Sequence, residues 1–297
     1  MNPLISSAIF AASLIAGGAF LPQTLAAEPP QNAQRIASVG GAVTEIIWAL
    51  GEQHRVIARD TTSVFPPDVL DLPDVGYMRR LSPEGILMVN PDLVLTEPGS
   101  GPPETLELLA EAQIPFIDVP GDYSANGILT RIHAVADALG VPEKGDALAA
   151  RIGAELEAVK LRGQARVTED SARPKVLFIL SMPGGRLNVS GTGTRADGII
   201  KMAGGRNAIS EFDQYRILAD EAIITAAPDV ILMMTATGTG STSNGEILAH
   251  PAIQLTPAGQ NNAIIRMDGS LMLGFGPRTA EAATQLTEAF FSKPESQ

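Results

Sequence analysis

The stretch LSPEGILMVNPDLVL (residues 81–95) recurs later in the chain as LADEAIITAAPDVIL (residues 218–232). Aligned without a gap, the two stretches share leucine, glutamate, isoleucine, proline, aspartate and a final leucine at matching positions. Each predicts a helix of about two turns that ends before a proline, because the residue that precedes a proline disfavours the helical conformation. The aliphatic run that follows, PDLVL or PDVIL, is typical of a buried strand. The similarity indicates an internal duplication; a shared helix-to-strand connection is the alternative source of part of it.

A second pair of stretches supports the duplication. RIASVGGAVTEIIWALG (35–51) has the pattern strand, glycine turn, helix, and residues 174–205 repeat that pattern with ADGIIKMAG in the place of TEIIWALG. The order strand, helix, strand, helix in both halves predicts an α/β protein of two lobes with parallel sheets. Between the halves, apolar residues at helical spacing predict one helix that contains no proline: Leu148, Ile152, Leu156 and Val159.

We therefore expect four parts along the chain. They are a signal peptide (1–27), an N-terminal lobe (28–142), a linking helix (143–167) and a C-terminal lobe (168–297). A rigid helical connector predicts lobes that do not swing through a wide hinge, with a ligand bound in the cleft between them.

The first 27 residues are typical of a secretory signal. They carry no charged side chain, contain an apolar run from Leu4 to Leu21, and end in small residues suited to cleavage. A buried N-terminal helix is the alternative. No later segment is apolar for long enough to span a bilayer. We expect the signal to be cleaved and the mature chain to be soluble and periplasmic.

Composition limits the possible partners. The chain has a formal net charge of −12, so nucleic acid is not an expected partner. It has no cysteine, hence neither a disulfide nor a thiol for lipid attachment. Aromatic residues make up 4% of the chain, which predicts cores of alanine, leucine, isoleucine and valine. We expect a monomer.

No catalytic pattern is present in the sequence. The three histidines, His54, His133 and His250, lack paired spacing, and there is no G-x-S-x-G motif. The glycine-rich stretches do not match a phosphate-binding loop, and we interpret them as turns that line a cleft: SMPGG (181–185), SGTGT (190–194) and TGTGSTSNG (237–245). We therefore predict that the protein is not an enzyme. A periplasmic hydrolase that uses these loops is the alternative.

The segment DVGYMRRLS (74–82) places one of the three tyrosines, Tyr77, close to Arg79 and Arg80. One interpretation is a solvated turn with exposed arginines. The other is that the neighbouring positive charge favours the ionised phenol, which would make Tyr77 a hard oxygen ligand for a ferric ion.

Glu84 and Glu221 occupy equivalent positions in the two repeats. Each is expected near the start of its short helix, where a carboxylate complements the helix dipole. That role alone accounts for both residues. The alternative is that each lobe displays one acidic side chain to a partner with matching basic sockets.

The sequence resembles the periplasmic haem-binding proteins of bacterial haem-uptake ABC transporters. Three runs carry the resemblance: RIASVGGAVTEIIWALG, RDTTSVFPPDVLDLPDVGYMRRLSPEGILMVNPDLVL and LGFGPRT. It covers essentially all of the mature chain. These proteins belong to the helical-backbone (class III) substrate-binding proteins, which also carry vitamin B12 and ferric siderophores.

The resemblance implies two α/β lobes joined by one long helix, with haem in the cleft between them. It implies that Tyr77 is the axial ligand to ferric iron. Arg79 or Arg80 would favour the phenolate or pair with haem propionates, and Arg79 is the closer match. Some members add a histidine from the second lobe. At that place this chain has Met182, so we expect ligation by Tyr77 alone or with a weak thioether contact from Met182.

The function that the resemblance implies is transport without chemical turnover. The protein would take ferric haem released from an outer-membrane receptor and deliver it to an inner-membrane ABC permease, onto which Glu84 and Glu221 would dock. Within the class, a carrier of a ferric siderophore or cobalamin is the alternative.

Overall fold

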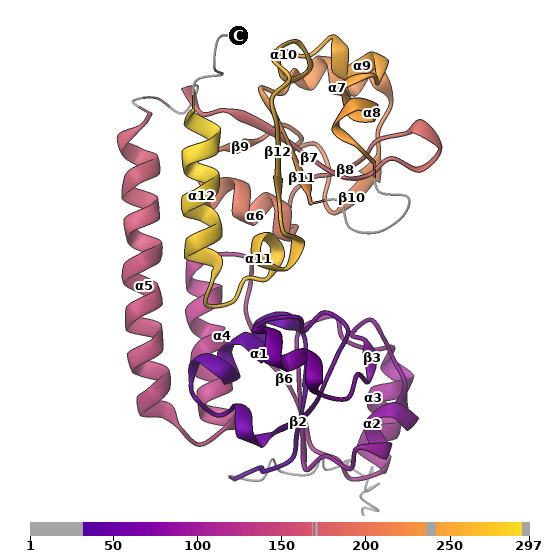
Figure 1. Cartoon of the computed structure of the whole chain (residues 1–297), viewed down its shortest axis with the longest axis vertical. Coiled ribbons are helices and arrows are strands. Elements are labelled where there is room, and N and C mark those ends of the chain that lie inside the picture. Colours follow the sequence, from indigo (N-terminus) through magenta and orange to yellow (C-terminus); the bar gives the residue numbers. More distant parts are fainter. Residues whose placement is uncertain (1–31, 168, 170–171, 236–241, 293–297) are drawn as a thin grey trace, which may run out of the picture.

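The computed structural model describes residues 32–167, 169, 172–235 and 242–292 (Figure 1). They form two α/β lobes, stacked along the long axis of the molecule and flanked by the long helix α5 (Pro142–Ala165). This arrangement confirms the predicted fold class. The expected signal peptide lies outside the described residues, as do residues 237–241 of the third glycine-rich stretch.

The N-terminal lobe is built on a four-stranded parallel sheet with the order β2-β1-β5-β6. Its strands are β1 (Ile36–Val39), β2 (Val56–Arg59), β5 (Leu93–Thr96) and β6 (Phe116–Asp118). Its helices are α1 (Gly41–Ala49), α2 (Pro83–Met88), α3 (Pro103–Glu111) and α4 (Ala125–Ala138), with 3-10 turns at Gln53–Arg55 and Pro67–Asp71. A separate hairpin joins β3 (Gly76–Tyr77) to β4 (Arg80–Leu81).

The C-terminal lobe has a six-stranded mixed sheet with the order β10-β8-β7-β11-β12, and β9 also pairs with β7. Its strands are β7 (Lys175–Ser181), β8 (Asn188–Ser190), β9 (Arg206–Asn207), β10 (Tyr215–Ile217), β11 (Val230–Met234) and β12 (Ile264–Met267). Its helices are α6 (Arg195–Met202), α7 (Asp220–Ala226), α8 (Asn244–Leu248), α9 (Pro251–Gln254), α10 (Pro257–Gln260), α11 (Gly269–Leu273) and α12 (Thr279–Phe291), with a 3-10 turn at Pro183–Gly185.

Two strands at one end of the C-terminal sheet refine the prediction of parallel sheets. β7, β9, β11 and β12 run parallel, whereas β8 and β10 are antiparallel to their neighbours. The connection from β7 to β8 is a short turn through Pro183–Gly185 rather than a helix, and a short turn reverses the chain direction.

The duplication is visible in both topology and local contacts. β1, β5 and β6 in one lobe correspond in order to β7, β11 and β12 in the other, and α2 and α7 precede β5 and β11. The Asp92 carboxylate accepts hydrogen bonds from the backbone N–H groups of Gln34 and Arg35 at 2.8 and 2.9 Å. Asp229 accepts one from Lys175 at 2.8 Å. The repeated Pro-Asp pair therefore fastens each strand to the start of its neighbour in the sheet.

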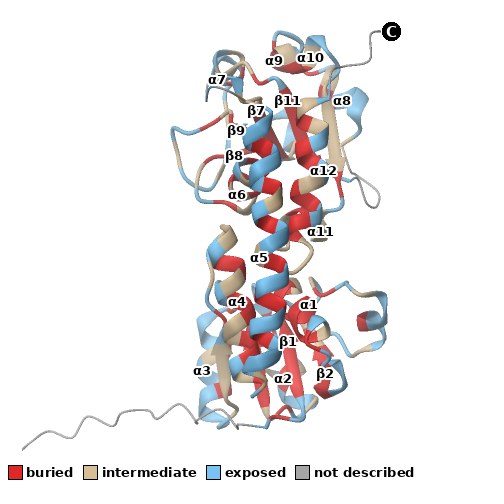
Figure 2. Ribbon diagram, turned by 90° about the vertical axis from the view of Figure 1, so that its left-hand side faces the viewer, coloured by how far each residue is buried: buried red, intermediate tan, exposed pale blue. Residues whose placement is uncertain are grey.

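One apolar core runs through both lobes. It includes Ile36 and Ile46 of the N-terminal lobe, Leu156 of α5, and Phe178 and Leu286 of the C-terminal lobe. The four apolar residues predicted to form the inner face of the linking helix are all buried. α5 packs against α4 in one lobe and α12 in the other, and its outer face is exposed (Figure 2). No helix in the described parts of the chain is both long enough and apolar enough to cross a membrane.

Candidate ligand-binding site

The hairpin that carries Tyr77 lies at the carboxyl edge of the N-terminal sheet. The backbone N–H of Thr61, in the loop after β2, donates to the carbonyl of Gly76 at 2.9 Å. The N–H of Gly101, in the loop after β5, donates to the carbonyl of Met78 at 2.9 Å. Ligands of open α/β sheets bind outside the carboxyl ends of the strands. The hairpin therefore places Tyr77 at the edge where a ligand site is expected.

The hairpin register decides which arginine accompanies Tyr77. Tyr77 pairs with Arg80, and Met78 and Arg79 form the two-residue connection. Directly opposed residues of an antiparallel pair project from the same face. Arg80 therefore shares a face with Tyr77, whereas the resemblance made Arg79 the closer match. Tyr77 is 46% exposed, both arginines are exposed, and Met78 is buried beneath the hairpin.

The loop before the hairpin adds apolar surface to the same edge. Asp60 is fully buried, and its carboxylate accepts hydrogen bonds from the hydroxyl groups of Thr62 and Ser63, each at 2.7 Å. These bonds explain why Asp60, Thr62 and Ser63 occur together in the run RDTTSVFPP, because they hold the loop in one conformation. Val64 and Phe65 follow directly and are exposed.

An ion pair joins the two lobes at Phe65. Arg278, at the start of α12, donates to both carboxylate oxygens of Glu45 on α1 at 3.0 and 2.5 Å. Its guanidinium carbon lies 3.6 Å from the centre of the Phe65 ring. Burial raises the pKa of Glu45, and the hydrogen bond and charge of Arg278 act in the opposite direction. Arg278 thus offsets part of the effect of burial on the pKa of Glu45.

A second ion pair joins the lobes beside α1. Glu97 is almost fully buried, and one of its oxygens accepts the N–H of Ala42 at 2.8 Å. Its other oxygen pairs with Arg195 of α6, which also donates to the carbonyls of Leu273 and Gly274 at the end of α11. Gly40 has φ 111°, and a Cβ there would lie 2.5 Å from the side chain of Glu97. The glycine turn therefore makes room for the carboxylate that bridges the lobes.

Sequence reasoning missed the four charged residues of these pairs. Glu45 lies within the apolar run GAVTEIIWA and Glu97 directly follows the buried strand LVLT, so both carboxylates could have been expected to need partners. The partners themselves are 233 and 98 positions away, which no local pattern reveals.

The remaining predicted site residues are Met182, Glu84 and Glu221, and Glu84 follows directly after the hairpin on α2. Met182 follows β7, is half-buried and packs against the apolar cluster under α7 to α10. Glu84 and Glu221 are exposed in the first turns of the equivalent helices α2 and α7. The Ser82 hydroxyl donates to Glu84 at 2.7 Å and lowers the pKa of Glu84.

Two of the three histidines, His133 and His250, have polar partners in the folded protein. His133 is half-exposed with Asp146 at 3.4 Å. His250 is buried, accepts the N–H of Ala252 at 3.3 Å, and lies 3.0 Å from the carbonyl of Gly185. In the described part of the chain, no three His, Cys, Asp or Glu side chains form a group that could hold a metal ion.

Two α/β lobes joined by one long helix, with an exposed phenol at a carboxyl edge, define a substrate-binding protein of the helical-backbone class. The family model described as periplasmic binding protein matches residues 36–271, and the chain belongs to that family. It is a family of transport proteins rather than of enzymes.

Solved structures and sequence relatives carry different ligand names. The periplasmic heme-binding protein RhuT from Roseiflexus sp. RS-1, in apo form, is 38% identical, with 88% of this chain and 98% of that chain covered and a TM-score of 0.81. The periplasmic heme-binding protein BhuT in complex with two hemes is 36% identical, with 86% and 97% covered and a TM-score of 0.81. The vitamin B12-binding protein of Vibrio campbellii is 28% identical over 261 residues, 87% of this chain and 90% of its own.

Proposed function

We propose that the chain is a periplasmic carrier that binds ferric haem between its lobes and delivers it to an inner-membrane ABC permease. The observation that carries the proposal is the exposed Tyr77 at the carboxyl edge of the N-terminal sheet, with Arg80 on the same face of the hairpin. The identities of 36% and 38% to haem-binding structures support haem over other ligands of the class.

The chemistry follows from the side chains of the hairpin and its loop. The Tyr77 phenol loses its proton when it binds iron, and the phenolate oxygen donates to the ferric ion. Arg80 offsets the negative charge on that oxygen. Val64 and Phe65 offer apolar surface to the porphyrin, whose burial drives binding. Because Met182 packs into the C-terminal lobe, Tyr77 is the sole protein ligand in this proposal.

Arg79 has a separate role in this scheme. It lies in the connection between the strands and is exposed, so its guanidinium is available to pair with a propionate. An Arg79→Gln variant would then lose affinity without a change in the iron spectrum, whereas a change at Tyr77 alters the spectrum.

The test is a titration with hemin followed by absorption spectroscopy. The wild-type protein is expected to give a Soret band and a high-spin ferric charge-transfer band at a stoichiometric end point. Tyr77→Phe keeps the ring but removes the donor oxygen, so the charge-transfer band is lost and affinity falls at least about tenfold, equivalent to about 1.4 kcal/mol. Tyr215→Phe removes a half-buried phenol of β10 and serves as the control. An unchanged spectrum in Tyr77→Phe would contradict the assignment.

Cobalamin is the second candidate, favoured by the relatives that are named vitamin B12-binding proteins. A parallel titration with cyanocobalamin separates the two ligands. The haem proposal expects hemin to bind more tightly and cyanocobalamin to leave the hemin titration unchanged. Tighter binding of cyanocobalamin, unaffected by Tyr77→Phe, would favour the second candidate.

Delivery requires contact with the permease, and we assign that contact to Glu84 and Glu221. Both are exposed at the starts of equivalent helices, one in each lobe. The double reversal Glu84→Lys/Glu221→Lys is expected to abolish growth on haem as the iron source and to leave hemin binding intact. Glu155→Lys/Glu288→Lys, which reverses two exposed carboxylates on α5 and α12, is the matched control. Growth at the wild-type rate in the first variant would remove the assignment.

In the same proposal, the haem comes from an outer-membrane receptor and the carrier acts as a monomer. Sedimentation of the haem-loaded protein tests the second statement, because a dimer would sediment with twice the mass of one chain.

A further inference from the structure

The hairpin that presents Tyr77 belongs to neither main sheet. Among the described strands, β3 and β4 pair only with each other, over two residues each. A two-stranded hairpin by itself is marginally stable in water. The side chain of Tyr77 is 46% exposed, so its own packing contributes little to holding it in place. The position of the phenol oxygen therefore depends on the bonds that fasten the hairpin to the rest of the lobe.

Asp74 joins the start of the hairpin to the end of β2. Its Oδ1 accepts the backbone N–H of Gly76 at 2.8 Å and the hydroxyl of Thr61 at 3.3 Å. Its Oδ2 accepts a hydrogen bond from the Arg59 guanidinium at 3.0 Å. An aspartate that bonds the N–H two residues further on holds the intervening backbone in a turn. Because Tyr77 directly follows Gly76, this turn sets the direction of the chain at the phenol.

Arg59, the last residue of β2, holds the Asp74 carboxylate in place. The side chain of Arg59 is 12% exposed, against 38% for that of Asp74. The same two segments also pair through their backbones: the N–H of Arg59 donates to the carbonyl of Pro73, and its carbonyl accepts from Val75, each at 2.9 Å. Hydrogen bonds between charged groups are stronger than those between neutral ones. The largely buried guanidinium thus fixes the carboxylate that in turn fixes the hairpin.

Asp92 makes the same kind of bonds at the opposite edge of the same sheet. It directly precedes β5, and its carboxylate accepts the backbone N–H groups of Gln34 and Arg35, which directly precede β1. Asp74 lies at the carboxyl edge, where the ligand is expected, and Asp92 lies at the amino edge. Loss of either carboxylate removes bonds to the backbone of the N-terminal lobe, but only Asp74 bonds the hairpin. The two residues therefore form a matched pair for mutagenesis.

We propose that Asp74 is a positioning residue for the iron ligand: it holds the turn at Gly76 so that the Tyr77 oxygen meets the haem iron in one orientation. This role rests on the proposed function, in which Tyr77 is the ligand. Asp74 acts through the backbone of the hairpin and has no contact with the haem. Removal of a residue that orients a metal ligand in this way typically lowers the affinity for the metal about 10–100-fold.

The test is a titration of the mature full-length protein with hemin, followed by absorption spectroscopy. Asp74→Ala is expected to weaken hemin binding about 10–100-fold and to alter the high-spin ferric charge-transfer band. Asp92→Ala is expected to lower the urea midpoint of the lobe and to leave both the hemin affinity and the spectrum unchanged. Equal losses of hemin affinity in the two variants would overturn the proposal, because the effect would then follow from the lower stability of the lobe.

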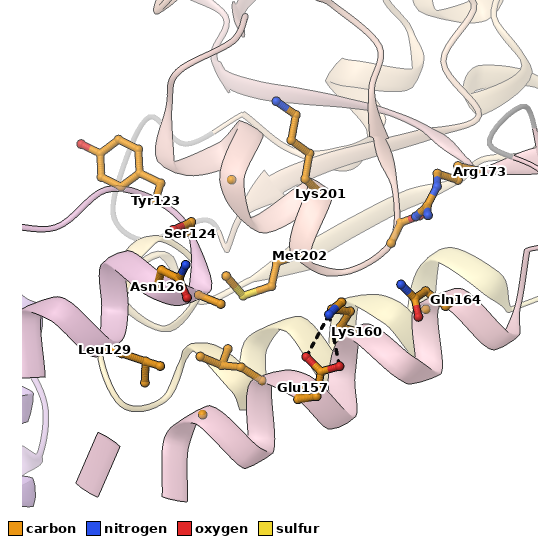
Figure 3. A pocket seen from close by; sticks show the side chains of 16 residues that line it. Tyr123, Ser124, Asn126, Leu129, Glu157, Lys160, Gln164, Arg173, Lys201 and Met202 are labelled. Carbon is orange, nitrogen blue, oxygen red and sulfur yellow. Dashed lines mark hydrogen bonds and ion pairs between the residues drawn. The ribbon is translucent and has the colours of Figure 1, made fainter. Parts of the chain in front are cut away.

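A second control removes an ion pair away from the hairpin. A hollow of about 500 Å³ lies beside α5, on the other side of the molecule from β3 (Figures 1 and 3). In it, the Lys160 ammonium lies 3.0 and 3.1 Å from the carboxylate oxygens of Glu157. Glu157→Gln weakens this pair and is expected to leave hemin binding unchanged. A loss of hemin affinity as large as that in Asp74→Ala would overturn the proposal.

A double variant shows whether Asp74 acts through Tyr77. If it does, Tyr77→Phe/Asp74→Ala binds hemin as weakly as Tyr77→Phe alone, within about twofold. Losses that multiply would overturn the positioning role. A spectrum that changes in Tyr77→Phe but not in Asp74→Ala would also overturn that role, and would leave ligation by Tyr77 intact. An unchanged spectrum in Tyr77→Phe would contradict the ligation itself, and the role of Asp74 with it.

Two conservative variants identify the bond that matters. Asp74→Asn keeps an oxygen that can accept the Gly76 N–H and loses the charge. Asp74→Glu keeps the charge beside Arg59, and its extra methylene moves the carboxylate away from Gly76. We expect hemin to bind more tightly to Asp74→Asn than to Asp74→Glu. Equal affinities or the reverse order would overturn the proposal, and this comparison decides if Asp74→Ala does not fold.

Discussion

Removal of Arg278 tests how strongly the ion pair with Glu45 holds the two lobes together. The side chain of Glu45 is 8% exposed and that of Arg278 is 21% exposed. Removing one partner of a buried pair costs about 3–5 kcal/mol, because the other charge stays buried without compensation. Since a fifth of the Arg278 side chain reaches solvent, we expect the lower end, about 3 kcal/mol, for Arg278→Met. Methionine keeps an apolar stem that can cover Phe65.

The loss of stability in Arg278→Met depends on pH because Glu45 is a titratable group. Burial raises the pKa of Glu45, and removal of Arg278 raises it further, because the hydrogen bond and charge of Arg278 are what lower it. A carboxyl group with a raised folded pKa contributes stability below its unfolded pKa and loses that contribution as the pH rises. The deficit of the variant therefore grows as the pH rises from the ordinary glutamate value of 4.5 toward neutrality.

The assay is urea denaturation of wild type, Arg278→Met and Glu45→Gln/Arg278→Met at about pH 5 and about pH 7. The double variant carries no buried charge at this place and is expected to regain most of the loss. A deficit below about 1 kcal/mol at neutral pH, or a double variant no more stable than the single one, would refute the reasoning.

Replacement of glycine by alanine is expected to lower the free energy of unfolding at Gly40 and to raise it at Gly153. Gly40→Ala places a Cβ 2.5 Å from the side chain of Glu97 at φ 111°, and we expect a loss of more than about 2 kcal/mol in urea denaturation; a neutral result would contradict the packing of the turn. Gly153→Ala meets Leu129 at an ordinary 3.6 Å and removes a glycine from the interior of α5. We expect a gain of about 1 kcal/mol; a lower melting temperature would count against it.

Much of the fold followed from local patterns. The repeated run that ends in Pro-Asp predicted a short helix and a buried strand in each lobe, and α2, β5, α7 and β11 have that order. The spacing of Leu148, Ile152, Leu156 and Val159 predicted α5 and its buried face. β8 and β10 were not predicted, because the glycine-rich turn after β7 gives no local sign that the chain doubles back into the sheet.

The candidate site was predictable where it rests on adjacent residues. Tyr77, Arg79 and Arg80 were found because they are neighbours in the sequence, but the register that places Arg80 on the face of Tyr77 is a property of the folded hairpin. The ion pairs of Glu45 and Glu97 join residues from different lobes, so their partners depend on the packing of the whole molecule.

The length of α5 sets the rotation of one lobe relative to the other about the axis of this helix. Its 24 residues span about 36 Å at 1.5 Å per residue, and each residue turns the helix by about 100°. α4 of the N-terminal lobe packs against one part of α5, and α12 of the C-terminal lobe packs against another. A single inserted residue between those parts would rotate one lobe by more than a quarter turn, carrying Arg195 and Arg278 out of reach of their carboxylates. The residue count of this helix thus encodes the mutual orientation of the two halves.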